Sequence, residues 1–409
     1  MTQNDKPRWG LVSATGVLTG LGHGFVAFAV SVLLNPLAAD LGTGRGVIST
    51  AIGLGRLVSG VTSPIIGRIT DLFGPRWIVV CGMVLMALGL MALGFVRSEL
   101  GLYFAWSLLV SAGAAAGFTV ALDKLVVATV RGKRGMALAV RFSVAAVVST
   151  LLVPFVTVMV ELLGWRITCF VWGGLMLLLI PVPLLWFRQD TVPRPVRPVT
   201  PAIAGSSPAA DAGLRRVIRQ PAYWVIAAAF TAQASVTTGL SVHLVPLMTD
   251  YGLDAVLAGG LFGLMILLSV PVRLLSGLVA DRVHPRHLPL VLGGLLVIEG
   301  IAIGSFALAP GFVTMLVVIA ALGIAAGAPT LLVLILCGEL FGESHFATVQ
   351  GSLMLLQVPG TMLAPIIAGY AYDFTGSYVG VIGGFAMLLV SGGVLLALLR
   401  PDAGHYRSA

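Results

Sequence analysis

Long apolar stretches separated by short polar connections constrain this chain more than any other feature of its sequence. Of its 409 residues, 58% are hydrophobic and 10% are charged, whereas an average soluble domain has about 25% charged residues. A membrane-spanning helix needs about 20 apolar residues, and twelve such segments fit this length. The sequence therefore predicts an all-α polytopic membrane protein, with spans at 10–35, 46–66, 77–96, 101–125, 136–160, 167–187, 222–249, 255–280, 288–308, 312–337, 346–370 and 378–399.

The segment 188–220 is the long polar interruption in this pattern. It is rich in Pro, Ala and Ser and carries several arginines, a composition typical of a linker. We therefore expect an N-terminal six-helix bundle at 1–187, a linker at 188–220, a C-terminal six-helix bundle at 221–400 and a tail at 401–409.

The basic residues alternate between the connections. Seventeen of the 24 Lys and Arg residues lie in the N-terminus, the even-numbered connections, the linker and the C-terminus, whereas the odd-numbered connections hold Arg45, Arg97 and Arg166. Because cytoplasmic connections are enriched in Lys and Arg, both termini and the linker are predicted to be cytoplasmic. We expect a multi-pass protein of the cell (inner) membrane.

The net charge of +8 does not indicate a nucleic-acid partner, because its distribution follows membrane topology. The three cysteines, Cys81, Cys169 and Cys337, lie in separate apolar stretches without metal-ligand spacing. The sequence shows neither a nucleophile–base pair nor a metal or cofactor motif. We therefore expect no enzyme activity, no metal and no cofactor.

The stretch Leu267–Arg282 is largely apolar, and Arg273 is the charged residue inside it, ahead of Asp281 and Arg282 at its end. Arg273 lies roughly 12 Å from the following basic loop, and a charge at such depth costs at least about 2.5–3.5 kcal/mol. Pro271 removes a backbone donor beside it and can open the helix locally. The arrangement indicates an anion site; the alternative is a structural arginine paired with a buried carboxylate.

A short motif occurs twice, 210 residues apart, after the second and the eighth predicted spans. Such a half-chain repeat is typical of transporters whose substrate site lies near the membrane midplane. The motif glycines allow close helix approach, and the acidic residue can bind a helix N-terminus or basic side chains. Its residues are Gly67, Asp71, Gly74 and Arg76 in the first copy, and Gly277 and Asp281 in the second.

The segment Gly67–Arg76 and the half-chain repeat resemble the major facilitator superfamily. Within it, Arg273–Asp281, Pro365–Tyr378 and Lys133–Ala137 resemble the monocarboxylate transporter and oxalate:formate antiporter branch. The resemblance implies two six-helix bundles, alternating access, a substrate-binding arginine at Arg273 and no cofactor. We expect a monomer with the lipid bilayer, a small organic anion and protons as partners.

The chain departs from that branch at several positions. The predicted first helix has no Lys or Arg, and Ser269 stands one turn before Arg273, where some members have an aspartate. The fourth helix carries Asp123 and Lys124, and the fifth carries Arg141. These differences leave the proton-coupling residues and the substrate open.

His243 is the second candidate for substrate binding. Its neutral ring can donate a hydrogen bond to a carboxylate, and it can titrate near neutral pH; some members of the branch have a histidine here. The alternative is a structural histidine bonded to a backbone carbonyl.

Other polar residues within the predicted spans are candidates for proton coupling or gating. Asp123 and Arg141 reach similar depths on the fourth and fifth spans, so we expect an ion pair that is either structural or releases a carboxylate during transport. His23 lies beside Gly16, Gly20 and Gly24, a spacing that indicates close helix packing. The candidates for coupling or gating are Asp123, Arg141, Lys124, Glu299 and Arg56.

The function predicted from these features is secondary active transport of a small organic anion, as proton-coupled monocarboxylate symport. The alternatives are an organic-anion exchanger, a drug-efflux member of the same superfamily, and a transporter-like sensor. A sensor should carry a folded cytoplasmic output domain, and the linker and the tail are too short to supply one.

Overall fold

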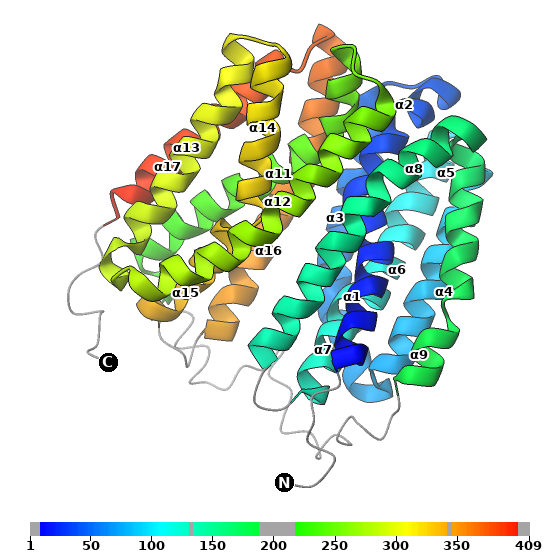
Figure 1. The fold of residues 1–409 in the computed structure, drawn as a ribbon, viewed down its shortest axis with the longest axis horizontal. Coiled ribbons are helices and arrows are strands. Elements are labelled where there is room, and N and C mark those ends of the chain that lie inside the picture. The colour runs from blue at the N-terminus through cyan, green and yellow to red at the C-terminus, as the bar shows by residue number, and fades with distance from the viewer. Residues whose placement is uncertain (1–8, 131–133, 188–216, 342–345, 400–409) are drawn as a thin grey trace, which may run out of the picture. The chain divides into compact units, whose positions relative to one another are not determined.

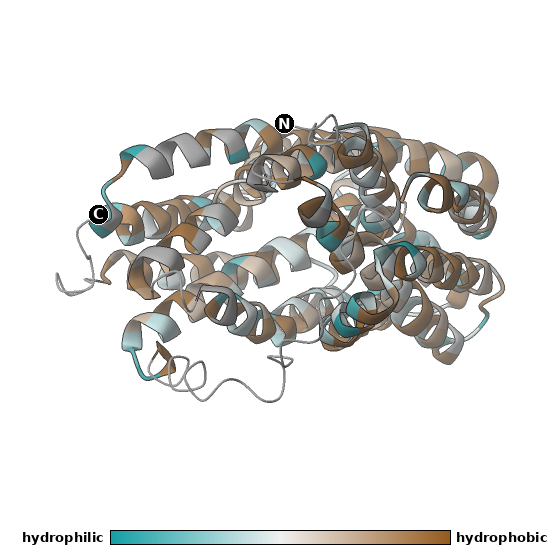
Figure 2. Ribbon diagram, turned by 90° about the horizontal axis from the view of Figure 1, so that it is seen from below, coloured by the Kyte–Doolittle hydropathy of each residue, from teal (hydrophilic) through white to brown (hydrophobic). Residues whose placement is uncertain are grey.

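The computed structural model of the chain describes residues 9–130, 134–187, 217–341 and 346–399. These residues are almost entirely helical (Figure 1), which confirms the predicted all-α fold class. Hydrophobic residues predominate along the helices in Figure 2, as a lipid surrounding requires.

By packing, the chain divides into two compact units. Unit 1 comprises Met1–Arg197 and Ser241–Gly263, and unit 2 comprises Pro198–Leu240 and Leu264–Ala409. The division falls inside α11 (Pro221–Asp250) and α12 (Ala255–Arg282), whose ends beside their connecting turn belong to unit 1. The bundle limits expected from the sequence stay a prediction.

Unit 1 is built from helices that match the first six predicted spans, and short π-helical segments interrupt the first and the fourth of them. These elements are α1 (Trp9–Gly24), η1 (Phe25–Ala29), α2 (Val30–Leu41), α3 (Arg45–Phe73), α4 (Pro75–Gly94), α5 (Glu99–Leu102), η2 (Tyr103–Val110), α6 (Ser111–Ala115), η3 (Ala116–Val120), α7 (Ala121–Thr129), α8 (Arg134–Leu178) and α9 (Pro181–Trp186).

The larger part of α11 and α12 belongs to unit 2, together with the helices that follow. The further elements are η5 (Pro285–His287), α13 (Leu288–Leu308), α14 (Phe312–Ala325), α15 (Pro329–Phe341), α16 (Phe346–Thr375) and α17 (Val379–Ala397).

Two glycines with positive φ set the turns in unit 1. Gly74, with φ 81°, ends α3, and Pro75 begins α4 at once; only glycine adopts this conformation without strain, and proline is favoured at a first helical position. Gly164, with φ 79°, bends the long helix α8. This bend separates the predicted spans 136–160 and 167–187.

Nine helical stretches of the described ranges are long and apolar enough to cross a membrane. One of them, Met136–Trp186, has 51 residues and covers two predicted spans across the Gly164 bend. The second and tenth predicted spans correspond to α3 and to the pair α14–α15. The total of twelve spans stays a prediction.

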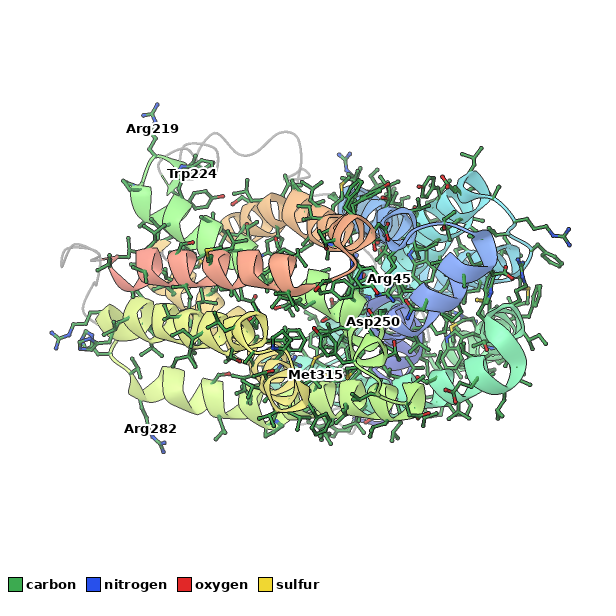
Figure 3. All side chains as sticks on the ribbon, turned by 90° about the horizontal axis from the view of Figure 1, so that it is seen from above. Arg45, Arg219, Trp224, Asp250, Arg282 and Met315 are labelled. Carbon is green, nitrogen blue, oxygen red and sulfur yellow. The ribbon has the colours of Figure 1, made fainter. Side chains whose placement is uncertain are left out.

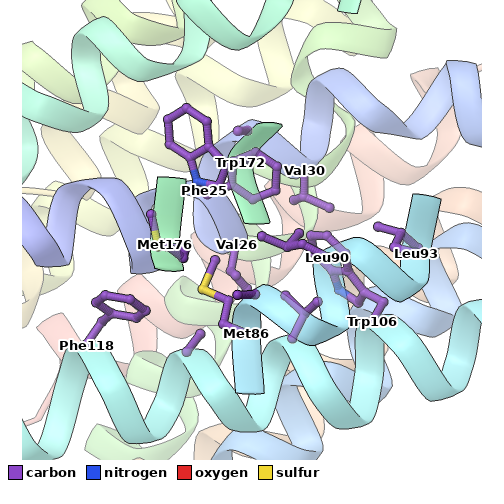
Figure 4. Packing of buried hydrophobic residues seen from close by; sticks show 14 of the residues in the cluster. Phe25, Val26, Val30, Met86, Leu90, Leu93, Trp106, Phe118, Trp172 and Met176 are labelled. Atoms are coloured by element: carbon purple, nitrogen blue, oxygen red, sulfur yellow. The ribbon is translucent and has the colours of Figure 1, made fainter. Parts of the chain in front are cut away.

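A large apolar cluster lies between the helices of unit 1 (Figure 4). Phe25 stacks on Trp172 with ring centroids 5.2 Å apart, and Trp106 and Phe118 are fully or almost fully buried. Such stacked aromatic pairs contribute about 0.5–1.5 kcal/mol beyond the area they bury. This packing fixes the positions of the helices that carry the polar groups of unit 1.

The predicted close packing of the first helix is confirmed. A Cβ added at Gly16 would lie 2.7 Å from the Arg141 carbonyl oxygen, and one at Gly20 would lie 2.6 Å from Val148 Cβ. In unit 2, α13 and α17 lie side by side (Figure 1) and approach in the same way at Gly293 and Gly393. Small residues allow such contacts between membrane helices.

Candidate functional site

Arg273 lies in α12 within unit 2 and is half-buried. Its Nη2 donates a hydrogen bond to the Ala326 backbone carbonyl at 3.2 Å. Among the described residues, no carboxylate lies within ion-pair distance of this guanidinium. The structure thus provides no carboxylate partner for Arg273, so the alternative of a structural ion pair finds no support in the described part of the chain.

The Ala326 carbonyl, which accepts the hydrogen bond from Arg273, lies in the break between α14 and α15. Pro329 has no N–H for the Ala325 carbonyl four residues earlier, and Gln233 Nε2 donates to that carbonyl at 3.3 Å. Side-chain donors therefore satisfy two successive carbonyls of the break. Gly323 and Gly327 let this segment approach α12, because added Cβ atoms would meet the Met265 and Ser269 carbonyl oxygens at 2.8 and 2.7 Å.

Pro271 does not interrupt α12, which continues as one helix from Ala255 to Arg282. The expectation of a local opening beside the guanidinium is therefore wrong. A proline removes only one hydrogen bond of the helix, and that loss alone leaves this helix continuous. The helical break beside Arg273 lies instead between α14 and α15.

His243 lies in the part of α11 that belongs to unit 1 and is buried. Its Nε2 is 3.1 Å from Ser49 Oγ of α3. Ser49 Oγ also donates to the Arg45 carbonyl at 2.7 Å, so in that arrangement it accepts a hydrogen bond from an Nε2–H of the imidazole. His243 of α11 is therefore hydrogen-bonded to a side chain of α3, which belongs to the first half of the sequence.

Further polar contacts hold the same end of α11 within unit 1. Arg45 and Asp250 form a two-point ion pair at 2.6 and 2.8 Å, and Figure 3 shows these two residues next to each other. Ser31 Oγ accepts from the Val245 N–H at 3.0 Å. Pro246 lies inside this end of α11 and removes one hydrogen bond of the helix. The contacts with Arg45 and Ser31 add hydrogen bonds near that position.

The predicted ion pair between Asp123 of α7 and Arg141 of α8 is confirmed. The Arg141 side chain is 0% exposed and that of Asp123 is 42% exposed. Arg141 Nη2 also donates to Thr19 Oγ1 at 2.9 Å and to the Phe118 carbonyl at 2.8 Å. Arg141 therefore joins three helical segments through charged and neutral acceptors.

Lys124 forms an ion pair with Asp71 of the first motif copy. Both side chains are partly exposed, at 35% and 66%. Because Asp123 and Lys124 are adjacent in α7, they point in different directions and bind different partners. The motif aspartate thus ties the end of α3 to α7.

The remaining motif residues behave differently. At Gly67 an added Cβ would find only Val120 Cγ1 at 3.8 Å, so this glycine does not provide a close helix approach. Gly74 is needed for its positive φ, and the Arg76 guanidinium lies 5.6 Å from the Trp77 ring centre. The surroundings of Gly277 and the side chain of Asp281 lie outside the described residues.

Two further candidates lie deep in their helices. Arg56 of α3 is half-buried, and no hydrogen bond or ion pair to a described residue involves it. Glu299 of α13 is 5% exposed, and its Oε1 has no hydrogen-bond partner among the described residues. The structure brings Glu299 into unit 2 and Arg56 into unit 1.

Several partners were not predicted from the sequence. Ser49, Thr19 and the Ala326 carbonyl carry no sequence signal, because threonine, serine and backbone carbonyls are common in any membrane helix. Asp71 was recognised as a motif residue, but its pairing with Lys124 needs the approach of α3 to α7. The predicted site residues therefore lie in both units, with Arg273 and Glu299 in unit 2 and Arg141, His243 and Arg56 in unit 1.

Comparisons with known proteins agree with this architecture. The family model described as Major Facilitator Superfamily matches residues 16–357. Monocarboxylate transporter 13 of Rattus norvegicus is 27% identical over 388 residues, covering 94% of this chain and 85% of that protein. Monocarboxylate transporter 11 of Homo sapiens is 26% identical over 395 residues, covering 95% of this chain and 81% of that protein.

Among solved structures, a bacterial homolog of the human lysosomal transporter Spinster, in an inward-facing and occupied conformation, has a TM-score of 0.72. The match covers 98% of this chain and 99% of that chain, at 15% sequence identity. At this identity the likeness concerns the fold alone.

Proposed function

The chain belongs to the major facilitator superfamily, and from this premise we propose that it is a proton-coupled symporter of a small organic anion. It is a multi-pass membrane transporter related to monocarboxylate transporters, and not an enzyme. The names of these relatives make monocarboxylates the first class of substrate to test. In the proposed reaction, the anion and a proton cross the membrane together by alternating access.

The observation that carries the proposal is the state of Arg273. Its guanidinium is half-buried in an apolar helix and touches a backbone carbonyl at 3.2 Å, with no described carboxylate to neutralise it. Guanidinium is always charged and matches a carboxylate through two parallel hydrogen bonds. A carboxylate substrate supplies the missing charge, and its binding lowers the cost of keeping Arg273 at membrane depth.

The binding role is tested by substituting Arg273 in the purified chain and measuring stabilisation by carboxylates. R273K keeps the charge but loses the planar fork, so the affinity should fall roughly tenfold or more, because a charge-assisted hydrogen bond is worth about 1.5–3 kcal/mol. R273A should show no carboxylate-dependent rise in Tm while its Tm without ligand stays close to that of the wild type. R97K, at an exposed position outside the predicted spans, is the matched control.

An R273A protein that carboxylates still stabilise as well as the wild type contradicts this role. Arg273 would then be a structural charge, and the anion site would lie elsewhere.

His243 is the proposed site of proton coupling or of a second contact to the substrate. The 3.1 Å contact with Ser49 supports the coupling role, because protonation of the ring changes which hydrogen bonds the pair can make. H243Q keeps a hydrogen-bond donor and loses the titratable group. Accumulation driven by a proton gradient should therefore fall several-fold more than exchange of substrate for substrate.

In S49A, the matched control, His243 keeps its titratable ring and loses only the serine contact. Coupling should be retained in part. If H243Q accumulates substrate like the wild type between about pH 5 and 8, His243 takes no part in the proton path.

Asp123, Arg141, Lys124, Glu299 and Arg56 stay candidates for coupling or gating. The ion pairs of Arg141 and Lys124 support a role in which a carboxylate is released when the helices rearrange. We further propose that the protein resides in the cell (inner) membrane as a monomer with both termini in the cytoplasm, as the Lys and Arg distribution indicates.

A further inference from the structure

The last part of α11, Ser241–Asp250, contacts α3 at two levels, all within unit 1. Asp250 forms the two-point ion pair with Arg45, and His243 contacts Ser49 at 3.1 Å. The two α11 residues are seven positions apart and the two α3 residues are four apart, so the members of each pair lie on one face of their helix. The order of the contacts shows that α11 and α3 run antiparallel here.

The same segment of α11 also contacts α2 at two levels. Ser31 Oγ accepts from the Val245 N–H at 3.0 Å, and Asn35 Nδ2 donates to Thr249 Oγ1 at 3.4 Å. Both helices advance by four residues between these contacts, which is about one turn, so α2 runs alongside α11 in the same direction. The segment is therefore attached on two sides.

Helix α11 belongs to both units, because its residues up to Leu240 are part of unit 2 and those from Ser241 onward are part of unit 1. A transport cycle in which the units move separately therefore has to break the contacts of the segment or to bend α11. Among the described contacts of the segment with α2 and α3, the charged one is the pair Arg45–Asp250. Since charge-assisted two-point contacts are roughly twice as strong as neutral hydrogen bonds, this pair contributes most to the attachment.

The attached segment encloses the imidazole of His243. This residue is 2% exposed and Ser49 is 0% exposed, whereas the side chains of Arg45 and Asp250 are 12% and 23% exposed. Arg45 begins α3 and Asp250 ends α11, so the ion pair lies at the helix ends and His243 lies deeper, by roughly 6 Å along α3. A proton reaches such a buried ring only when water or another carrier reaches it.

The other charged groups near this end of unit 1 have different places or partners. Asp254 Oδ1 accepts from two N–H groups of the first turn of α12. Asp40 of α2 pairs with Arg166 of α8. Arg56 lies seven residues, or about two turns, beyond Ser49 on α3.

Building on the proposed function, in which His243 takes part in proton coupling, we propose that the Arg45–Asp250 ion pair is a latch that controls when His243 exchanges its proton with water. The closed latch holds Ser241–Asp250 on α2 and α3 and keeps the ring enclosed. Opening of the latch detaches the segment and exposes the ring. Arg45 and Asp250 are therefore positioning residues, because they act through His243.

The test measures how fast His243 reacts with diethyl pyrocarbonate, which transfers an ethoxycarbonyl group to a neutral imidazole nitrogen. The purified full-length chain in lipid nanodiscs is treated at about pH 7, where an ordinary imidazole is mostly neutral. Mass spectrometry follows the modified fraction, with the exposed His287 as the internal reference. In the wild type, His243 should react far more slowly than His287.

In D250N, His243 should react about fivefold faster or more, because the asparagine leaves Arg45 without its anion. D40N is the matched control, since it removes a comparable ion pair with Arg166 that does not involve α11. It should leave the reactivity of His243 unchanged. The charge exchange R45D/D250R should restore part of the slow reaction, because the pair can form again with reversed polarity.

Transport gives the second readout, in proteoliposomes with labelled lactate and butyrate as probes. An open latch lets His243 exchange protons out of step with the substrate. D250N should therefore accumulate substrate several-fold less than the wild type under an inward proton gradient, while exchange of substrate for substrate is largely retained. A rise in His243 reactivity without a fall in accumulation contradicts the control of proton exchange by the latch.

The two readouts separate this inference from the proposed function. An unchanged reactivity of His243 in D250N overturns the latch and leaves the roles tested by H243Q and R273A standing. Wild-type accumulation by H243Q overturns the proton role of His243 itself, and the latch then has no proton to control. If D250N does not yield folded protein, R45K decides, because it keeps the charge without the two-point contact. Faster modification of His243 in R45K supports the latch, and a wild-type rate contradicts it.

Discussion

The three guanidiniums that lie within the predicted spans, buried Arg141 and half-buried Arg56 and Arg273, differ in what surrounds their charge. Arg141 has a carboxylate, a hydroxyl and a backbone carbonyl. Arg273 has a backbone carbonyl, and Arg56 has no described hydrogen-bond partner. Arg141 therefore has an anionic partner as well as two neutral acceptors, with its Nε left without a described partner, whereas a guanidinium that lacks an anion favours binding of one. This difference separates Arg141, whose charge is already compensated, from Arg273, which is proposed to bind a carboxylate.

The Asp123–Arg141 pair makes a prediction at this scale. D123N and R141Q should each lower the Tm of the purified protein, and R141Q more, because Arg141 also bonds Thr19 and Phe118. We expect the D123N loss to be about 2–3 kcal/mol, below the roughly 3–5 kcal/mol of a fully buried pair, because Asp123 is 42% exposed and solvent screens its charge.

The double variant should recover part of the loss, since it removes the uncompensated charge together with its partner. K124Q, which leaves the Asp71 carboxylate at an exposed position, is the control and should cost less than about 1 kcal/mol. Strictly additive losses in the double variant would rule out a direct coupling.

At the scale of helices, most elements could be predicted from the sequence and their internal irregularities could not. The largely apolar segment 288–308 coincides with α13, because the basic residues Arg286 and His287 precede it and Pro310 and Gly311 follow it. The break before Pro329 was missed, since it depends on which carbonyls find side-chain donors such as Gln233 and Arg273. The π-helical segments of unit 1 were missed as well. Pro271 was expected to open α12, whereas α12 continues through it as one helix.

The side of the membrane on which each connection between helices lies provides a second prediction. In a chain whose Cys81, Cys169 and Cys337 are replaced by serine, we expect a single cysteine at Glu99, the exposed first residue of α5, to react with an impermeant maleimide from outside the cell. A cysteine at Ser206, in the predicted linker and outside the described residues, should react only after the membrane is opened. Reaction of both positions from the same side contradicts the proposed topology.

For the whole molecule, the superfamily and the transport function follow from features that the sequence carries openly. The Asp123–Arg141 pair could also be foreseen, because a short turn places both residues at matched depth. The contacts of His243 with Ser49 and of Lys124 with Asp71 could not, since each joins helices far apart in the chain. Which substrate binds depends on such long-range contacts. The charge of Arg273 at membrane depth therefore predicted an anionic substrate without specifying which anion.

The central claim is that the chain moves a carboxylate together with a proton through the Arg273 site. It is tested most directly by uptake of a panel of labelled mono- and dicarboxylates into proteoliposomes, with and without an inward proton gradient. The account predicts that at least one carboxylate accumulates above its external concentration in wild-type liposomes when the gradient is present, only equilibrates when it is absent, and does neither in R273A. Uptake of carboxylates that is equally fast in R273A and wild type, or that ignores the proton gradient, would contradict it.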